Sequence, residues 1–156
     1  MSTLVVYDSV FGNTEKIAQA ITDALGVSPA RRVTELQPAD LQGVKLLIVG
    51  SPTRGFRPTP AMSTYLKNLP AGALNGVKVT AFDTRMSATA MTKAPGILRF
   101  LARHFGFAAE KIAKGLQKAG GTPTAEPGWF GVEASEGPLT DGELERAAAW
   151  AGQLKN

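Results

Sequence analysis

Two short apolar runs without a polar interruption, Leu4–Tyr7 and Leu46–Val49, constrain the fold of this chain most strongly. Strands that are apolar on both faces belong to parallel sheets that helices cover on both sides. Between the two runs, apolar residues recur with helical spacing from Ile17 to Leu25, and Gly26 follows as a helix end. We therefore predict both runs as neighbouring central strands of an α/β protein.

The alternation of strand and helix patterns continues to the end of the chain. Further strands are predicted at 32–34, 77–82 and 129–132. Helices are predicted from Thr59-Pro60 to Pro70, in two pieces between 95 and 119 that break at Gly106, and after a capping box formed by Thr140 and Glu143. The predicted buried faces of the 95–105 helix and of the last helix consist of Ile97, Leu98, Leu101 and Phe105, and of Leu144, Ala147, Ala148 and Ala151. Repeated β-α units of this kind predict a doubly wound sheet.

The composition limits the chemistry that the chain can perform unaided. With 156 residues, 44% of them apolar, the chain is long enough for one core, and we predict a single domain over residues 1–156. It has no cysteine and a single histidine, His104, which argues against disulfides, thiolate nucleophiles, iron–sulfur clusters and Cys/His metal sites. Redox chemistry would therefore need a bound organic cofactor.

Charge and hydropathy indicate the setting in which the protein works. The 17 basic and 13 acidic residues leave a net charge of +4, which favours anionic ligands or acidic partners, without the dense basic blocks of a nucleic-acid binder. The N-terminal sequence lacks the pattern of a signal peptide, and no apolar run approaches the roughly 20 residues that span a bilayer. We expect a cytoplasmic protein that binds neither nucleic acid nor membrane.

Three predicted loops are rich in small polar and turn-forming residues: 9–14, 51–60 and 83–87. Each follows a predicted parallel strand, and ligands of doubly wound sheets bind beyond the carboxyl ends of the strands. The first loop opens directly into a helix, where backbone N–H groups and the helix dipole favour a phosphate. No lysine lies within 9–14, so neutral donors would have to bind it.

Four segments together resemble the short-chain flavodoxins over essentially the whole chain. The family's phosphate loop is similar to SVFGNT at 9–14, and its second flavin loop resembles GSPTRGFRPTPAM at 50–62. Its third loop resembles AFDTRMS at 81–87, and its closing stretch resembles EGPLTDGELERA at 136–147. The four matches occur in the family's order and at its spacing.

The resemblance implies a three-layer α/β fold with five parallel strands in the order 2-1-3-4-5 and helices on both faces. It also implies FMN as the cofactor, with the phosphate on the first loop and the isoalloxazine between the other two. Neither a catalytic nor a metal-ligating residue is predicted. The residues that the resemblance assigns to the cofactor are Ser9, Val10, Phe11, Gly12, Asn13, Thr14, Ser51, Pro52, Thr53, Arg54, Gly55, Phe56, Asp83, Thr84, Arg85 and Met86.

The chain departs from the family in three ways. Typical members have a threonine at the position of Phe11, and many place aromatic side chains on both sides of the flavin, where this chain offers Phe56 and Met86. Carboxylates usually surround the flavin of low-potential members, whereas the loops here carry Arg54, Arg57 and Arg85, opposed locally by Asp83. Cations near a reduced flavin stabilise it, which predicts a milder reductant.

Three functions are compatible with these observations. The first is an electron-transfer protein that shuttles one or two electrons between a separate reductase and a partner with an acidic docking surface. The second is an FMN-dependent quinone or small-acceptor reductase, so whether the protein is an enzyme stays open. The third is a non-redox interaction module whose cofactor site has degenerated, as Phe11 would suggest.

Overall fold

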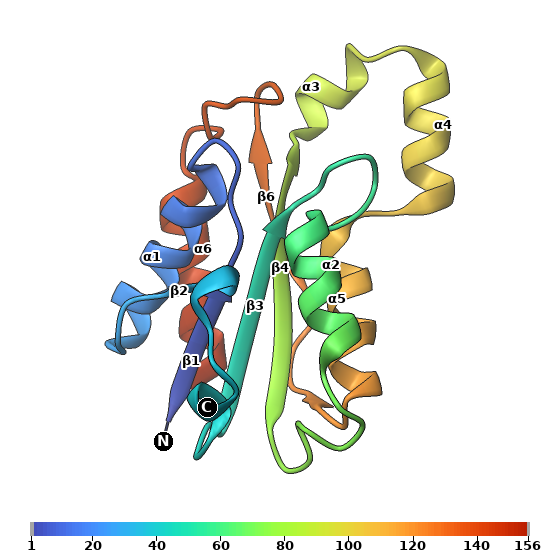
Figure 1. Ribbon diagram of the computed structural model, residues 1–156. Coiled ribbons are helices and arrows are strands. Elements are labelled where there is room, and N and C mark those ends of the chain that lie inside the picture. The colour runs from blue at the N-terminus through green and yellow to red at the C-terminus, as the bar shows by residue number, and fades with distance from the viewer. Residues whose placement is uncertain (1, 156) are drawn as a thin grey trace.

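The computed structural model describes residues 2–155, so the first and last residues of the predicted domain lie outside the described part. Its centre is a sheet in which all strand pairs are parallel, with the order β2-β1-β3-β4-β5, and β6 also pairs with β4 (Figure 1). The predicted strand order is confirmed. The strands are β1 (Thr3–Tyr7), β2 (Arg31–Arg32), β3 (Leu46–Pro52), β4 (Lys78–Met86), β5 (Thr122–Pro123) and β6 (Gly128–Val132).

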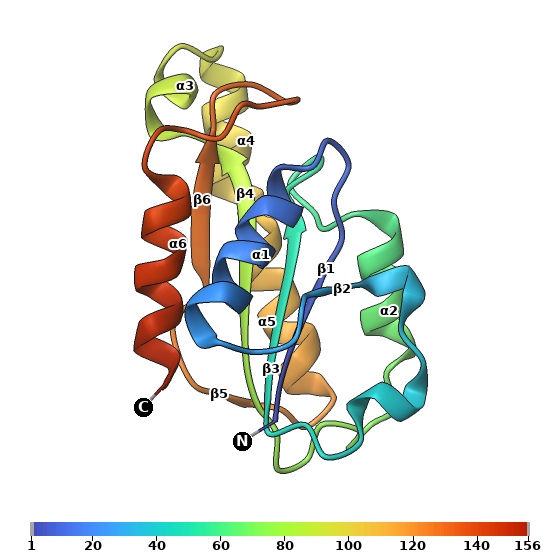
Figure 2. The ribbon, with the colours of Figure 1, turned by 90° about the vertical axis from the view of Figure 1, so that its left-hand side faces the viewer.

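Helices cover both faces of the sheet, as Figure 2 shows. One core cluster joins β1, β3 and β4 to α1 and α6 through residues such as Ile17 and Ala147, and another joins the opposite face to α2 and α5 through Met62 and Ile112. The helices are α1 (Asn13–Leu25), α2 (Pro60–Asn68), α3 (Ala88–Thr92), α4 (Gly96–Phe105), α5 (Ala108–Lys118) and α6 (Glu143–Gly152). Short 3-10 turns span Val33–Glu35, Pro38–Leu41 and Gln153–Lys155.

Several strand boundaries differ from the prediction. The edge strand is only Arg31–Arg32, because a 3-10 turn begins at Val33. The predicted fifth strand, 129–132, is present as β6, and a further short strand, β5, precedes it; Pro127 between them has no N–H for the ladder. β4 continues to Met86, so most of the predicted third loop is strand, paired with β6 from Phe82 onward.

The predicted capping box at α6 is wrong. The helix begins after Gly142, whose φ of 87° is left-handed, and the Glu143 carboxylate accepts hydrogen bonds from the Gly131 N–H at 2.6 Å and from the Arg146 guanidinium. A tertiary contact has replaced the local one, and the Thr140 hydroxyl is buried without a hydrogen-bond partner among the described residues. Leu144, predicted to be buried, is 42% exposed.

The helix α4 forms as predicted, but most of its apolar face is not buried. Ile97 and Phe105 are 65% and 52% exposed, and Ala102 is the buried residue of this helix. Figure 1 shows why: α3 and α4 project beyond the ends of the strands, whereas α5 lies along the sheet. The chain therefore inserts a helical arm, residues 88–106, between β4 and the helix that covers it.

Candidate functional site

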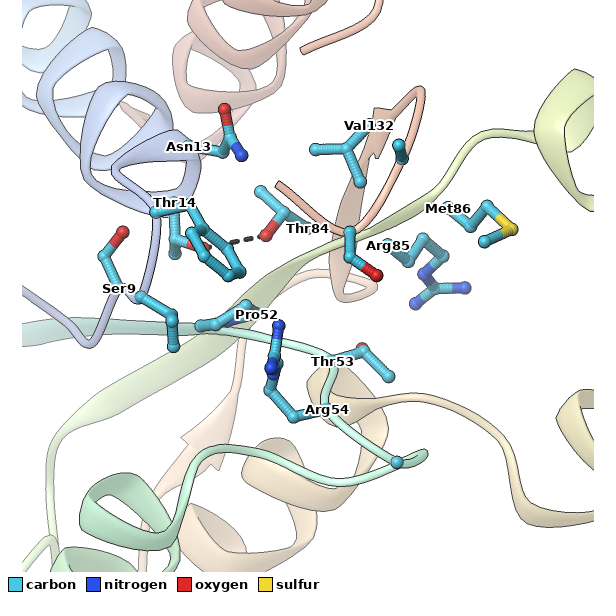
Figure 3. Close-up of a pocket in the computed structure, with 15 residues that line it drawn as sticks. Ser9, Asn13, Thr14, Pro52, Thr53, Arg54, Thr84, Arg85, Met86 and Val132 are labelled. Atoms are coloured by element: carbon cyan, nitrogen blue, oxygen red, sulfur yellow. Dashed lines mark hydrogen bonds between the residues drawn. The ribbon is translucent and has the colours of Figure 1, made fainter. Parts of the chain in front are cut away.

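A cavity of about 310 Å³ lies beyond the carboxyl ends of β1, β3, β4 and β6 (Figure 3). Four chain segments form its wall, and none of the lining residues is acidic. The residues that line it are Ser9, Val10, Phe11, Asn13, Thr14, Pro52, Thr53, Arg54, Gly55, Thr84, Arg85, Met86, Val132, Ala134 and Ser135. The structure therefore brings the three predicted loop segments together, as their positions after parallel strands required.

A buried carboxylate at the end of β1 holds the first loop. Asp8 accepts hydrogen bonds from the Ser9 N–H at 3.0 Å, from Arg32 at 3.0 Å and from the Thr59 hydroxyl that caps α2. The Ser9 hydroxyl in turn accepts the Gly12 N–H at 3.0 Å. Gly12, with a φ of 95°, then turns the chain into α1. Asp8 thus orients the loop without lining the cavity.

The first loop leaves backbone donors free where α1 begins. No hydrogen bond among residues 2–155 is donated by the N–H groups of Val10, Phe11, Asn13 or Thr14. The first turn of a helix has no internal acceptors for such groups, and its dipole attracts negative charge. The Thr14 hydroxyl lies 2.7 Å from that of Thr84, which joins the helix start to β4 (Figure 3). This donor set fits a phosphate.

The second loop makes a tight turn at the cavity rim. Gly55 and Phe56 both have positive φ, at 56° and 65°, and the turn is closed by hydrogen bonds of 2.7 and 3.1 Å between Arg54 and Arg57. The Arg54 guanidinium lies 5.3 Å from the centre of the Phe11 ring. The Phe56 ring stacks on Phe105 of α4, with centroids 6.0 Å apart, and does not line the cavity.

In the second half of β4, Asp83 is fully buried and binds both Arg85 and the start of α5. Its carboxylate accepts two hydrogen bonds from Arg85, at 2.8 and 2.7 Å, and one from the Ala109 N–H at the start of α5, at 2.9 Å. Burial raises the pKa of Asp83, while Arg85 and the Ala109 N–H act in the opposite direction. Asp83 thus balances the charge of Arg85, and the Phe107 ring, with its centre 3.9 Å from the guanidinium carbon, helps to hold its position.

Four of the predicted cofactor residues stand behind the cavity wall, and three wall residues were missed. Gly12, Ser51, Phe56 and Asp83 shape the loops, and the buried Ser51 hydroxyl, for example, accepts the Thr59 N–H at 3.0 Å. The missed residues are Val132, Ala134 and Ser135, which follow β6. The same strand-end argument could have found them, because the strand after β4 ends at the same edge of the sheet.

Comparison with known proteins connects this geometry to a fold. No protein-family model and no curated protein sequence matches the chain. Among solved structures, oxidised flavodoxin 2 from Bacillus cereus is similar over 100% of both chains, with a TM-score of 0.75 and 20% identity. The match to a flavodoxin from the domain Archaea covers 99% of this chain and 96% of that one, with a TM-score of 0.68 and 19% identity.

A third solved structure has the same architecture. A flavodoxin, WrbA-like protein from Agrobacterium tumefaciens has a TM-score of 0.68 and 15% identity, and the match covers 97% of this chain and 93% of that one. Together with the parallel strand order and the helices on both faces of the sheet, these similarities establish that the chain has the flavodoxin fold.

Proposed function

We propose that this protein binds FMN and transfers electrons. The observation that carries the proposal is the cavity itself: it opens where the strands end in a flavodoxin fold, it has no acidic wall residue, and unpaired N–H groups meet there at the start of α1. In this proposal the N–H groups of Phe11, Asn13 and Thr14 hold the phosphate. FMN, when bound, supplies one-electron or two-electron transfer.

The remaining wall residues would hold the flavin ring. Thr53 and Gly55 from the second loop and Met86 from the end of β4 line the cavity away from α1. A methionine thioether next to a ring contributes on the order of 1 kcal/mol, which partly replaces an aromatic neighbour. Because Arg85 is neutralised by Asp83, any effect of loop cations on the flavin potential would come mainly from Arg54, which lines the cavity and forms no ion pair among residues 2–155. Arg57, expected to touch the flavin, lies outside this cavity.

The proposal includes a separate reductase and an acidic partner in the cytoplasm. The described residues contain no group of three or more His, Cys, Asp or Glu side chains arranged to hold a metal. No helix within residues 2–155 is long and apolar enough to cross a bilayer. A small domain whose redox group is FMN can carry electrons between two other proteins, and this is the role that we propose.

Titration with FMN and with riboflavin, followed by flavin fluorescence quenching, tests the proposal. We expect FMN to bind at least about tenfold more tightly, because only FMN offers charged acceptors to the free N–H groups. Thr14→Val should weaken FMN binding, and Thr22→Val on the same helix is the matched control, since its hydroxyl bonds to Gln19 away from the cavity. If the protein quenches the fluorescence of neither FMN nor riboflavin, the proposal is refuted and the non-redox interaction module is favoured.

One assay separates the shuttle from the enzyme. The loaded protein should oxidise NADPH only when a reductase is added, because the electron-transfer proposal assigns hydride uptake to another protein. Steady-state oxidation of NADPH in the presence of a quinone, without a reductase, would instead favour the FMN-dependent quinone or small-acceptor reductase.

A further inference from the structure

The charges of this protein are divided between two parts of the chain. Residues 41–125, the basic segment, contain twelve Lys and Arg and only two acidic residues. The rest of the chain contains five Lys and Arg and eleven acidic residues. Both acidic residues of the basic segment, Asp83 and Glu110, lie beside Arg85, at 2.7 and 3.6 Å. None of the other eleven cations of this segment forms an ion pair among residues 2–155.

Five of these cations surround one groove. α2 and α5 lie side by side, and the Leu66 side chain is so close to Gly115 that a Cβ there would approach it to 3.3 Å (Figure 1). Between the helices is a groove of about 640 Å³, separate from the candidate FMN cavity and without an acidic lining residue. Its cations are Arg57, Lys67, Lys111, Lys114 and Lys118.

The groove combines this charge with an apolar floor. Leu66, Leu69 and Ala119 line it together with the backbone of Gly115. Lys111, Lys114 and Lys118 follow at i, i+3 and i+7 along one side of α5, a row of roughly 10 Å at 1.5 Å per residue. Burial and the neighbouring Arg57 lower the pKa of Lys111, whose ammonium donates a hydrogen bond to the Phe56 carbonyl.

We propose that the α2–α5 groove is the docking site for an acidic amphipathic helix of a partner protein. Such a helix would place apolar residues at i, i+3 or i+4 and i+7 on the floor and carboxylates against the cations on both sides. A single lipid headgroup would leave most of the five cations without a counter-charge. A nucleic acid would gain little binding energy from the leucine side chains of the floor. The proposal stands on the groove alone and does not require bound FMN.

A designed peptide series tests this with the full-length protein. The probe is a fluorescein-labelled helical peptide of about four turns, with Leu at i, i+4 and i+7 and Glu at the flanking positions. The expected result is saturable binding by fluorescence anisotropy that weakens as salt is raised. Replacing every Glu by Gln, or every Leu by Ala, should each weaken binding at least about tenfold, since charge and apolar contact both contribute.

Two charge-matched variants locate the binding. Lys67→Glu/Lys114→Glu/Lys118→Glu should weaken peptide binding at least about tenfold, because three attractions become repulsions. Lys45→Glu/Lys78→Glu/Lys93→Glu makes the same change in net charge at exposed positions of the same basic segment outside the groove, and should leave binding within about twofold. Far-UV circular dichroism confirms that both variants are folded.

Three results would overturn the proposal: equal loss in both triple variants, undiminished binding of the Ala-for-Leu peptide, or tighter binding of a single-stranded oligonucleotide of equal charge. Each would mean general attraction of polyanions instead of a helix-binding groove. Titration of the same variants with FMN keeps the two proposals separate. Failed peptide binding with intact FMN binding rejects only the groove, and the reverse result rejects only the flavin site.

Discussion

At the scale of single residues, buried carboxylates hold the loops and helices of this protein in place. Asp8 fixes the first loop, Asp83 fixes the start of α5, and Glu143 ties α6 to β6. Each accepts at least one backbone N–H, and each also bonds to an arginine. Charge-assisted bonds of this kind are shorter and stronger than neutral ones, so the geometry around each carboxylate is well defined.

Glu143 gives a prediction on pH. Its hydrogen bond from Arg146, more than the opposing effect of burial, lowers the pKa of Glu143 below the ordinary value of 4.5. A carboxyl whose pKa falls on folding contributes stability above its unfolded-state pKa, and this contribution is lost as the pH falls through the folded value. Glu143→Gln should therefore cost about 1 kcal/mol at pH 7, and the difference from wild type should shrink below pH ~4.

Urea denaturation at a series of pH values measures this effect. Glu145→Gln is the control, because Glu145 lies exposed on the same helix and makes no ion pair among residues 2–155. The Glu145→Gln variant should have the same free energy of unfolding as the wild type at all pH values. A Glu143→Gln difference that stays constant from neutral to acid pH would show that the ionised form of Glu143 contributes nothing.

At the scale of elements, two neighbouring helices with similar amphipathic patterns have different roles. α5 buries Ile112 and Leu116 completely against the sheet, whereas α4 leaves Ile97 and Phe105 more than half exposed. The Phe56–Phe105 pair, at 6.0 Å, is the aromatic contact that joins α4 to the second loop. The arm therefore depends on few buried contacts, which is the condition for local opening without global unfolding.

Substitutions in the two helices should separate local from global stability. Phe105→Ala removes an aromatic pair that contributes about 1 kcal/mol, so the amides of α4 should exchange hydrogen faster. The urea midpoint should barely move, since surface changes stay within about 0.5 kcal/mol. Leu116→Ala, in contrast, should cost about 2–5 kcal/mol. A large loss of global stability in Phe105→Ala would show that the arm belongs to the cooperative core.

The same pair of helices shows what the sequence can and cannot predict. Helical spacing predicted both helices and the break at Gly106, because periodicity and a glycine with positive φ are local properties. Which protein surface covers an apolar face is not local, so the exposure of Phe105 was not predictable. For the same reason the stretch Asp83–Met86 looked like a loop: its pairing with β6 depends on residues about forty-five positions later in the chain.

The candidate site was more predictable than its details. Strand ends of a parallel sheet meet at one edge, so three polar segments after three strands had to come together. Whether a given side chain faces the cavity or supports it depends on neighbours that are distant in sequence. Asp83 points toward α5 and Phe56 toward α4, and neither helix contact can be read from the loop sequences.

At the scale of the whole molecule, one sheet carries two cores. Along β3, Leu47 and Val49 belong to the cluster under α2 and α5, and Leu46 and Ile48 belong to the cluster under α1 and α6. The two clusters thus share the same backbone hydrogen bonds. Loss of either face would leave an unpartnered apolar sheet surface, so we expect both clusters to unfold in one transition.

Conservative substitutions on opposite faces test this coupling. Ile112→Val and Ile21→Val each remove one methyl group from a fully buried side chain and should cost about 0.5–1.5 kcal/mol. Because the two residues belong to different clusters, the double variant should lose the sum of the two within about 0.5 kcal/mol. Trp150 lies against Phe82 and Phe130 in the α1/α6 cluster, so in a Trp129→Phe background, which leaves Trp150 as the one tryptophan, the fluorescence reports on one face. Ile112→Val, on the other face, should still shift the fluorescence midpoint as far as the circular dichroism midpoint, and separate midpoints would mean that the two faces unfold independently.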